Sequence, residues 1–152
     1  MMSVDGAGMA QFKRVRLFAF LILVAAPLVY LVIIYAVPFP RKSGGEYDMM
    51  LYILLIVAMI QPAAYLFIER FHLTIQRQQR PSAMQPDRLF FTLSLIKFAF
   101  VEAIYIYGLV VAIISGIANH ALYFYAIGII WTFILWPRRG AYEHFMQKAH
   151  NL

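Results

Sequence analysis

Four long apolar runs constrain this chain more than any other feature of its sequence. A helix needs roughly 20 apolar residues to cross the hydrocarbon core of a bilayer. The runs predict an all-α, polytopic membrane protein with four transmembrane helices in a single membrane domain spanning residues 1–152. The predicted spans are residues 15–37, 47–71, 89–115 and 121–136, of which the last is the shortest.

The overall composition supports a membrane location. Of the 152 residues, 63% are hydrophobic and only 13% are charged, whereas soluble domains have about 25% charged residues. A soluble fold of this length could not hide so much apolar surface, but a lipid bilayer accepts an apolar exterior. The net charge of +6 comes from basic residues at the ends of the runs, which indicates anionic lipid headgroups and topology rather than nucleic acid.

Proline and glycine residues separate the runs. The link from Gly116 to His120 is short, so the third and fourth spans are expected to form an antiparallel hairpin. The first run is longer than the apolar part of a signal peptide and contains no small-residue cleavage site before Pro38. We therefore expect it to be retained as a helix.

The basic residues predict the orientation, because cytoplasmic loops are enriched in lysine and arginine. If the spans alternate, one side receives only Arg41 and Lys42. The termini and the 72–88 loop are therefore predicted to be cytoplasmic, in the inner membrane of a bacterium. Residues 139–152 are expected to form a cytoplasmic tail, solvated and partly ordered rather than an interfacial amphipathic helix. The side predicted to be cytoplasmic receives ten basic residues, namely Lys13, Arg14, Arg16, Arg70, Arg77, Arg80, Arg88, Arg138, Arg139 and Lys148.

Glu102 is the polar residue that most needs an explanation. It lies about thirteen residues into the third span, where a charge costs roughly 3 kcal/mol on insertion scales. Desolvation at that depth favours the neutral, protonated carboxyl. The residue either takes up and releases a proton, or stays protonated and only hydrogen-bonds a neighbouring helix. The residues alone leave both interpretations open.

Two other polar residues lie within the spans. Gln61 precedes Pro62 and lies at about the same depth as Glu102, counted inward from the loop between spans two and three. It is a possible polar partner of the carboxyl, although an interhelical hydrogen bond is the favoured interpretation. Lys97 lies on another face of the helix, since five residues advance about 140°, and is expected to extend to the interface.

Small residues recur along the third span. Glycine and alanine at such spacing allow another helix to approach closely, so the pattern predicts a helix–helix interface near Glu102. One series is Gly108, Ala112 and Gly116, and a second pair is Ala99 and Ala103.

The sequence contains no signature of soluble enzyme chemistry. There is no cysteine, and the four histidines at positions 72, 120, 144 and 150 are too scattered to predict a metal site. No phosphate-binding loop, nucleophile elbow or pair of catalytic carboxylates is present. We therefore predict no catalytic residue, no metal, no cofactor and no catalytic activity of the chain's own.

Residues 100–113 carry a family resemblance. They read Phe-Val-Glu-Ala-Ile-Tyr-Ile-Tyr-Gly-Leu-Val-Val-Ala-Ile. This resembles the C-terminal helix of the proteolipid c subunit of rotary ATP synthases, which typically reads Phe-x-Glu-Ala-x-x-x-Tyr-Gly-Leu-Val-Val-Ala. Upstream, residues 77–81 read Arg-Gln-Gln-Arg-Pro, similar to the cytoplasmic Arg-Gln-Pro loop of that family. The resemblance covers about residues 77–114.

The resemblance implies roles for individual residues. Glu102 would be the proton-binding carboxylate, and Tyr107 would be the hydroxyl beside it. Ala103 stands where sodium-binding members often have serine, which favours protons. Gln61 would match the glutamine that sodium-type members place on the preceding helix. Unlike that family, the second span has no glycine, and two further spans flank the hairpin.

Three functions are compatible with these features. The first is a small membrane subunit that takes part in proton translocation through Glu102 within a larger complex. The second is a structural accessory subunit of a multi-subunit membrane complex. The third is a small homo-oligomeric secondary transporter, for which the Gln61–Pro62 pair is the only hint. In each case the expected partners are the lipid bilayer and other membrane subunits, in a homo- or hetero-oligomer.

Overall fold

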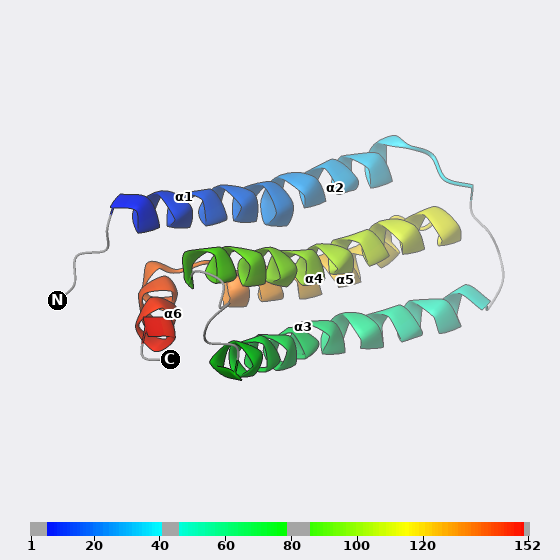
Figure 1. Cartoon of the computed structure of the whole chain (residues 1–152). Coiled ribbons are helices and arrows are strands. Elements are labelled where there is room, and N and C mark those ends of the chain that lie inside the picture. The colour runs from blue at the N-terminus through cyan, green and yellow to red at the C-terminus, as the bar shows by residue number, and fades with distance from the viewer. Residues whose placement is uncertain (1–5, 41–45, 79–85, 151–152) are drawn as a thin grey trace.

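The described part of the molecule is helical throughout (Figure 1). A computed structural model describes residues 6–40, 46–78 and 86–150. Within these ranges the regular structure consists of helices, which confirms the all-α prediction. The elements are α1 (Gly6–Phe20), the π-helix η1 (Leu21–Ala25), α2 (Ala26–Ala36), α3 (Glu46–Gln78), α4 (Pro86–Ser115), α5 (Asn119–Leu135) and α6 (Arg139–His150).

The first three elements form one long rod with a π turn in its middle. The Ala26 N–H donates to the Leu21 carbonyl, five residues earlier instead of four. Pro27 follows at the start of α2. A proline inside a helix cannot donate a hydrogen bond, and its ring meets the carbonyl one turn before it. The wider π turn accommodates the proline without ending the helix.

Helix α4 lies at the centre of the molecule. The rod of α1, η1 and α2 runs along one side of it, α3 runs along another, and α5 lies beside it (Figure 1). Helix α6 crosses near the N-terminal end of α4 and contacts it. The predicted hairpin of the third and fourth spans corresponds to α4 and α5, which make the most extensive contact of any helix pair.

Gly116 ends α4 and starts the turn into α5. Its φ angle of 67° lies in the left-handed region that glycine adopts at little cost. Its N–H donates to the Ala112 carbonyl over 2.9 Å, which is the hydrogen bond of an αL helix end. Gly116 therefore terminates the helix, while Gly108 and Ala112 of the same series lie buried on α4.

Large apolar side chains cover the outside of the molecule. Phe67 on α3 is 74% exposed, Phe133 on α5 is 72% exposed and Val32 on α2 is 65% exposed. So much exposed apolar surface is stable only when lipid covers it. The chain is therefore a polytopic membrane protein.

The number of crossings follows from helix length and composition. Three segments in the described ranges are long and apolar enough to span a bilayer, namely Met9–Ala36, Asp48–Tyr65 and Pro86–Ser115. Helix α5 meets the criterion only together with α6, across a bend of 54°. The described residues thus supply three spans, or up to four if this bent pair counts as one; four complete spans remain a prediction.

The C-terminal segment differs from the expected solvated tail. Residues 139–150 form α6, in which Tyr142 is 1% exposed and Phe145 is 9% exposed. The Tyr142 ring centroid lies 5.5 Å from that of Phe12 and 5.0 Å from that of Phe90. The Tyr142 hydroxyl also donates to Asp87 Oδ1 over 2.7 Å. The prediction of a partly ordered, solvated tail is therefore wrong for these residues, because α6 buries its aromatic face against α1 and α4.

The positions of the helix ends agree with spans that alternate in direction. One end of the molecule holds the N-terminal ends of α1 and α4, the C-terminal end of α3, and α6 (Figure 1). Several predicted cytoplasmic cations are exposed on these segments, whereas Arg80, Arg41 and Lys42 lie outside the described residues. Which side of the membrane this end faces stays a prediction. The exposed cations are Lys13, Arg14, Arg16, Arg88, Arg138 and Arg139.

The close approach of Gly128 on α5 to Tyr105 on α4 yields a stability prediction. A Cβ atom at Gly128 would lie 2.6 Å from Cζ of Tyr105, whose ring is only 2% exposed and has little room to move. We expect Gly128→Ala to destabilise the protein by about 1–3 kcal/mol through overpacking, measured as a lower unfolding temperature in detergent. In Gly140→Ala the new Cβ meets nothing within 4 Å, so this control should keep or slightly raise the unfolding temperature. Equal effects of the two substitutions would contradict the packing described.

Candidate functional site

Glu102 lies on the side of α4 that faces α2. Its carboxyl is half-buried, and its Oε1 atom accepts a hydrogen bond of 2.8 Å from the hydroxyl of Tyr30. Tyr30 belongs to α2 and is half-buried as well. The acidic side chain therefore has a donor from another helix inside the span.

Tyr30 is a site residue that the sequence analysis missed. It is 72 positions away from Glu102 in the chain, and no short motif connects the two. A usable signal was nevertheless present. The first and third spans run in the same direction, and Tyr30 lies about fifteen residues into the first, close to the depth of Glu102. A count of depth applied to every polar side chain would have paired them.

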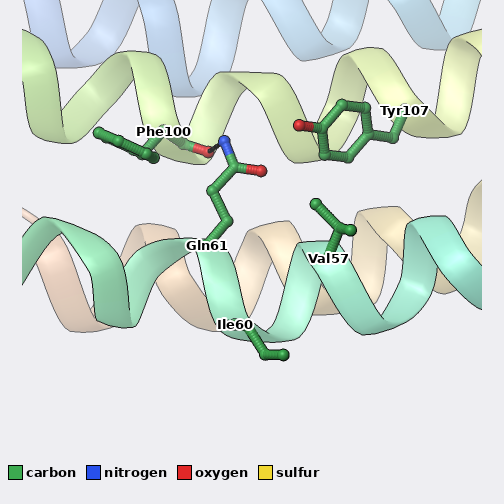
Figure 2. Close-up of a pocket in the computed structure, with 5 residues that line it drawn as sticks. All are labelled: Val57, Ile60, Gln61, Phe100 and Tyr107. Atoms are coloured by element: carbon green, nitrogen blue, oxygen red, sulfur yellow. Dashed lines mark hydrogen bonds between the residues drawn. The ribbon is translucent and has the colours of Figure 1, made fainter.

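Gln61 makes an interhelical hydrogen bond, but not with Glu102. Its Nε2 atom donates to the Phe100 carbonyl of α4 over 3.2 Å. Its Oε1 atom is buried, and no group in the described ranges donates a hydrogen bond to it. Figure 2 shows the amide between α3 and α4, with the Tyr107 hydroxyl pointing toward it. The favoured interpretation of Gln61 as an interhelical tie agrees with this geometry.

A crevice separates α3 from α4 at this position. It has a volume of about 410 Å³ and is lined by Val57, Ile60, Gln61, Phe100 and Tyr107 (Figure 2). Three of these side chains are apolar, so the crevice carries its polarity on Gln61 and Tyr107. Glu102 is not part of its lining.

Glu102 and Tyr107 therefore occupy different faces of α4. Five residues advance about 140° around an α-helix, so one side chain faces α2 while the other faces α3. Among the described residues, no hydrogen bond joins Glu102 to Tyr107 or to Gln61. The position beside the carboxyl, which the resemblance implied for Tyr107, holds Tyr30 in this structure.

The predicted packing residues divide between two environments. A Cβ atom at Gly108 would lie 3.1 Å from Cβ of Phe124 and 3.2 Å from the Ala121 carbonyl, so Gly108 allows the close approach of α5 within the same chain. Ala112 is fully buried in the cluster that contains Ala121. By contrast, Ala103 is half-buried and Ala99 is exposed. The second small pair therefore lies on the side of α4 that the described helices leave more open.

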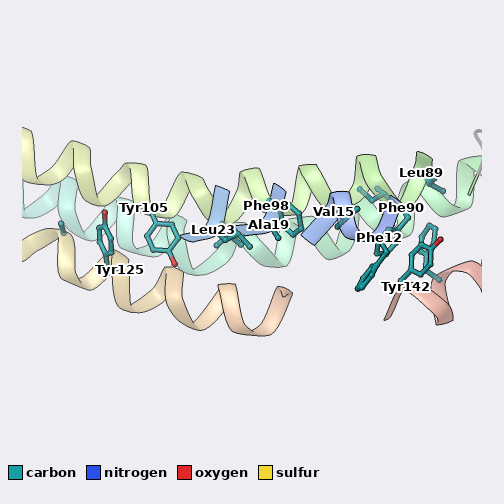
Figure 3. Close-up of a cluster of buried hydrophobic side chains, with 14 of the residues drawn as sticks. Phe12, Val15, Ala19, Leu23, Leu89, Phe90, Phe98, Tyr105, Tyr125 and Tyr142 are labelled. Carbon is teal, nitrogen blue, oxygen red and sulfur yellow. The ribbon is translucent and has the colours of Figure 1, made fainter. Parts of the chain in front are cut away.

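Tyrosines surround the hydrogen bond between Tyr30 and Glu102. The Tyr125 hydroxyl of α5 donates to the Pro27 carbonyl over 2.8 Å. The rings of Tyr105 and Tyr125 meet edge to face, with centroids 5.1 Å apart (Figure 3). The Tyr105 hydroxyl shares a hydrogen bond of 3.0 Å with Thr132. Phenol hydroxyls of α2, α4 and α5 thus find partners on other helices, namely the Glu102 carboxyl, the Thr132 hydroxyl and the Pro27 carbonyl.

The other ionisable groups in the described part of the chain form no obvious second site. Lys97 is half-buried, with its Nζ atom 5.6 Å from the ring centroid of Phe98. Arg139 and Glu143 form an exposed ion pair of 2.8 Å on α6. Within the described ranges, no three His, Asp or Glu side chains gather where they could hold a metal ion.

Comparison with known proteins agrees with one part of this site. The profile of the family described as the C subunit of ATP synthase matches residues 80–115, a segment that includes Glu102, Tyr107 and all of α4. No curated protein and no solved structure matches the chain. The partial resemblance found at residues 77–114 is thus confirmed, and the helix that carries Glu102 is similar to the proteolipid c subunit of ATP synthases.

Proposed function

We propose that this chain is a small membrane subunit in which Glu102 binds and releases a proton, and that it acts within an oligomeric membrane assembly. One observation carries the proposal. The half-buried carboxyl of Glu102 lies near the middle of the helix that matches the ATP synthase c family, and a phenol of another helix donates to it over 2.8 Å. The match suggests a c-subunit-like role in ion translocation.

The surroundings of Glu102 suit a group that changes its protonation state. Tyr30 donates to Glu102 Oε1 over 2.8 Å, and a phenol hydroxyl can donate to a carboxylate or accept from a protonated carboxyl. The site can therefore keep a hydrogen bond in either protonation state, without leaving an unpaired charge in the membrane.

The proposal includes an assembly because the polar groups in the described part of one chain do not line a continuous path for a proton to Glu102. The crevice at Gln61 lies on a different face of α4 from Glu102. Exposed Ala99 and half-buried Ala103 leave the adjoining side of α4 accessible to a further helix. Small residues at this spacing allow such a helix to approach closely.

A structural accessory subunit is the second candidate. It is favoured by the fact that Tyr30 already satisfies one oxygen of Glu102. In that case Glu102 would stay protonated, and the hydrogen bond would only tie α2 to α4. The two candidates therefore differ in whether Glu102 exchanges its proton.

Substitution of the carboxyl separates the candidates. We expect Glu102→Gln to abolish the adduct formed by a hydrophobic carbodiimide, detected by mass spectrometry. It should also reduce proton movement into vesicles containing the purified assembly by more than tenfold. Gln can still accept a hydrogen bond from Tyr30, so the fold should persist. Glu143→Gln is the matched control, because Glu143 forms an exposed ion pair on α6, and it should keep both the adduct and the proton movement. Unchanged proton movement in an assembled Glu102→Gln protein would favour the accessory subunit.

Removal of the donor should alter the reactivity of the carboxyl. Tyr30→Phe deletes the hydroxyl that donates to Glu102. A hydrogen bond to a charged group is worth about 1.5–3 kcal/mol, which corresponds to a factor of roughly 10–150, so we expect carbodiimide labelling of Glu102 to become at least about tenfold faster once the phenol no longer holds the carboxyl. Tyr35→Phe is the control, because Tyr35 lies on the same helix but is 57% exposed. Equal labelling rates in the two variants would show that Tyr30 does not influence the carboxyl.

A further inference from the structure

We infer that Tyr125 is a positioning residue for Glu102, which acts through the Pro27 carbonyl and Tyr30. The inference rests on the proposed proton binding at Glu102. It concerns a residue of α5 that does not contact the carboxyl by a hydrogen bond.

Tyr125 joins two distant parts of the chain. The Tyr125 hydroxyl donates to the Pro27 carbonyl over 2.8 Å, between residues 98 positions apart. Tyr125 is only 8% exposed, and its hydrogen bond to Pro27 is buried. The phenol therefore has a specific backbone partner where a Phe would have none.

The Pro27 carbonyl lies next to the irregular part of the rod. Leu21–Ala25 form the π turn, and Pro27 directly after it cannot donate a backbone hydrogen bond. Helices bend at prolines and at π turns because the ladder of backbone hydrogen bonds is interrupted there. The bond from Tyr125 holds this turn against α5, so the direction in which α2 continues depends on it.

Tyr30 follows Pro27 by three residues, which is about 4.5 Å along the helix axis. Its hydroxyl reaches Glu102 Oε1 over 2.8 Å. If the Tyr30 hydroxyl moved away from Glu102 by just under ~1 Å, that bond would exceed the length at which hydrogen bonds are effective. The position of the turn at Pro27 therefore controls the hydrogen bond to Glu102.

Tyr125 is itself held in place by the helix that carries the carboxyl. Its ring meets the Tyr105 ring edge to face at 5.1 Å (Figure 3), and Tyr105 follows Glu102 by three residues on α4. Tyr105 in turn shares a hydrogen bond with Thr132 of α5. The contacts thus form a closed circuit from Glu102 through Tyr30, Pro27, Tyr125 and Tyr105 back to α4.

The test removes only the hydroxyl of Tyr125. In Tyr125→Phe the ring and its stacking remain, while the bond to Pro27 is lost. Two readouts report on Glu102 directly. One is the infrared carbonyl band of its protonated carboxyl, identified by its absence in Glu102→Gln, and the other is the rate of carbodiimide labelling. Tyr123→Phe is the matched control, because Tyr123 lies two residues away on α5 and is 57% exposed.

We expect Tyr125→Phe to shift the band and to speed labelling severalfold, in the same direction as Tyr30→Phe, while Tyr123→Phe changes neither. The double variant Tyr30→Phe/Tyr125→Phe should behave like Tyr30→Phe alone, because both substitutions act on one hydrogen bond. Additive effects would overturn the route through Tyr30.

A merely structural role for Tyr125 would also be visible. In that case Tyr125→Phe would lower the unfolding temperature and leave the band and the labelling rate of Glu102 unchanged, and the inference would be wrong. Neither readout depends on proton movement across the membrane. If Glu102 reacts with the carbodiimide but the assembly moves no proton, the proposed function fails. The shift of the infrared band in Tyr125→Phe still decides the role of Tyr125.

Discussion

Lipid cannot form hydrogen bonds, and the interior of this bundle is arranged around that constraint. A polar group inside the membrane needs a partner from the protein, and those partners come from other helices. Tyr30 donates to Glu102, Tyr125 to the Pro27 carbonyl, and Gln61 to the Phe100 carbonyl. These bonds fix the rotation of each helix about its axis, which apolar contacts alone specify poorly. The polar groups that form the candidate site thus also determine the packing.

Helix α4 has a different kind of neighbour on each of its sides. Gly108 lets α5 approach closely, Glu102 faces Tyr30 of α2, and the Phe100 carbonyl accepts from Gln61 of α3. Its sequence is also the part that matches the ATP synthase c family. In this chain that helix does not stand in a simple two-helix hairpin, because the rod of α1, η1 and α2 covers the side on which Glu102 lies. The first span therefore supplies the hydrogen-bond donor of the carboxyl.

The helices could be predicted from sequence because a membrane span needs only length and apolar composition, which Val15 to Val37 or Leu89 to Ser115 display openly. Glu102 could be found by its cost at that depth. Tyr30 could not be found by motif, since its role depends on how α2 and α4 lie side by side. Similarly, Tyr142 lies in a short, polar segment, and only Phe12 and Phe90, far away in the chain, explain how α6 is packed. The π turn was not predicted either, although Pro27 inside the first apolar run is a visible signal for such an interruption of the helix.

The docking of α6 has a consequence for the order in which the molecule is completed. Chains are synthesised from the N-terminus, so Phe12 and Phe90 leave the ribosome well before Tyr142, their buried aromatic neighbour. Until α5 has been inserted and α6 has emerged, those two rings and the acceptor Asp87 lack their partner. The last described helix thus joins the beginnings of α1 and α4, and this end of the bundle reaches its final packing only when the earlier helices are already in the membrane.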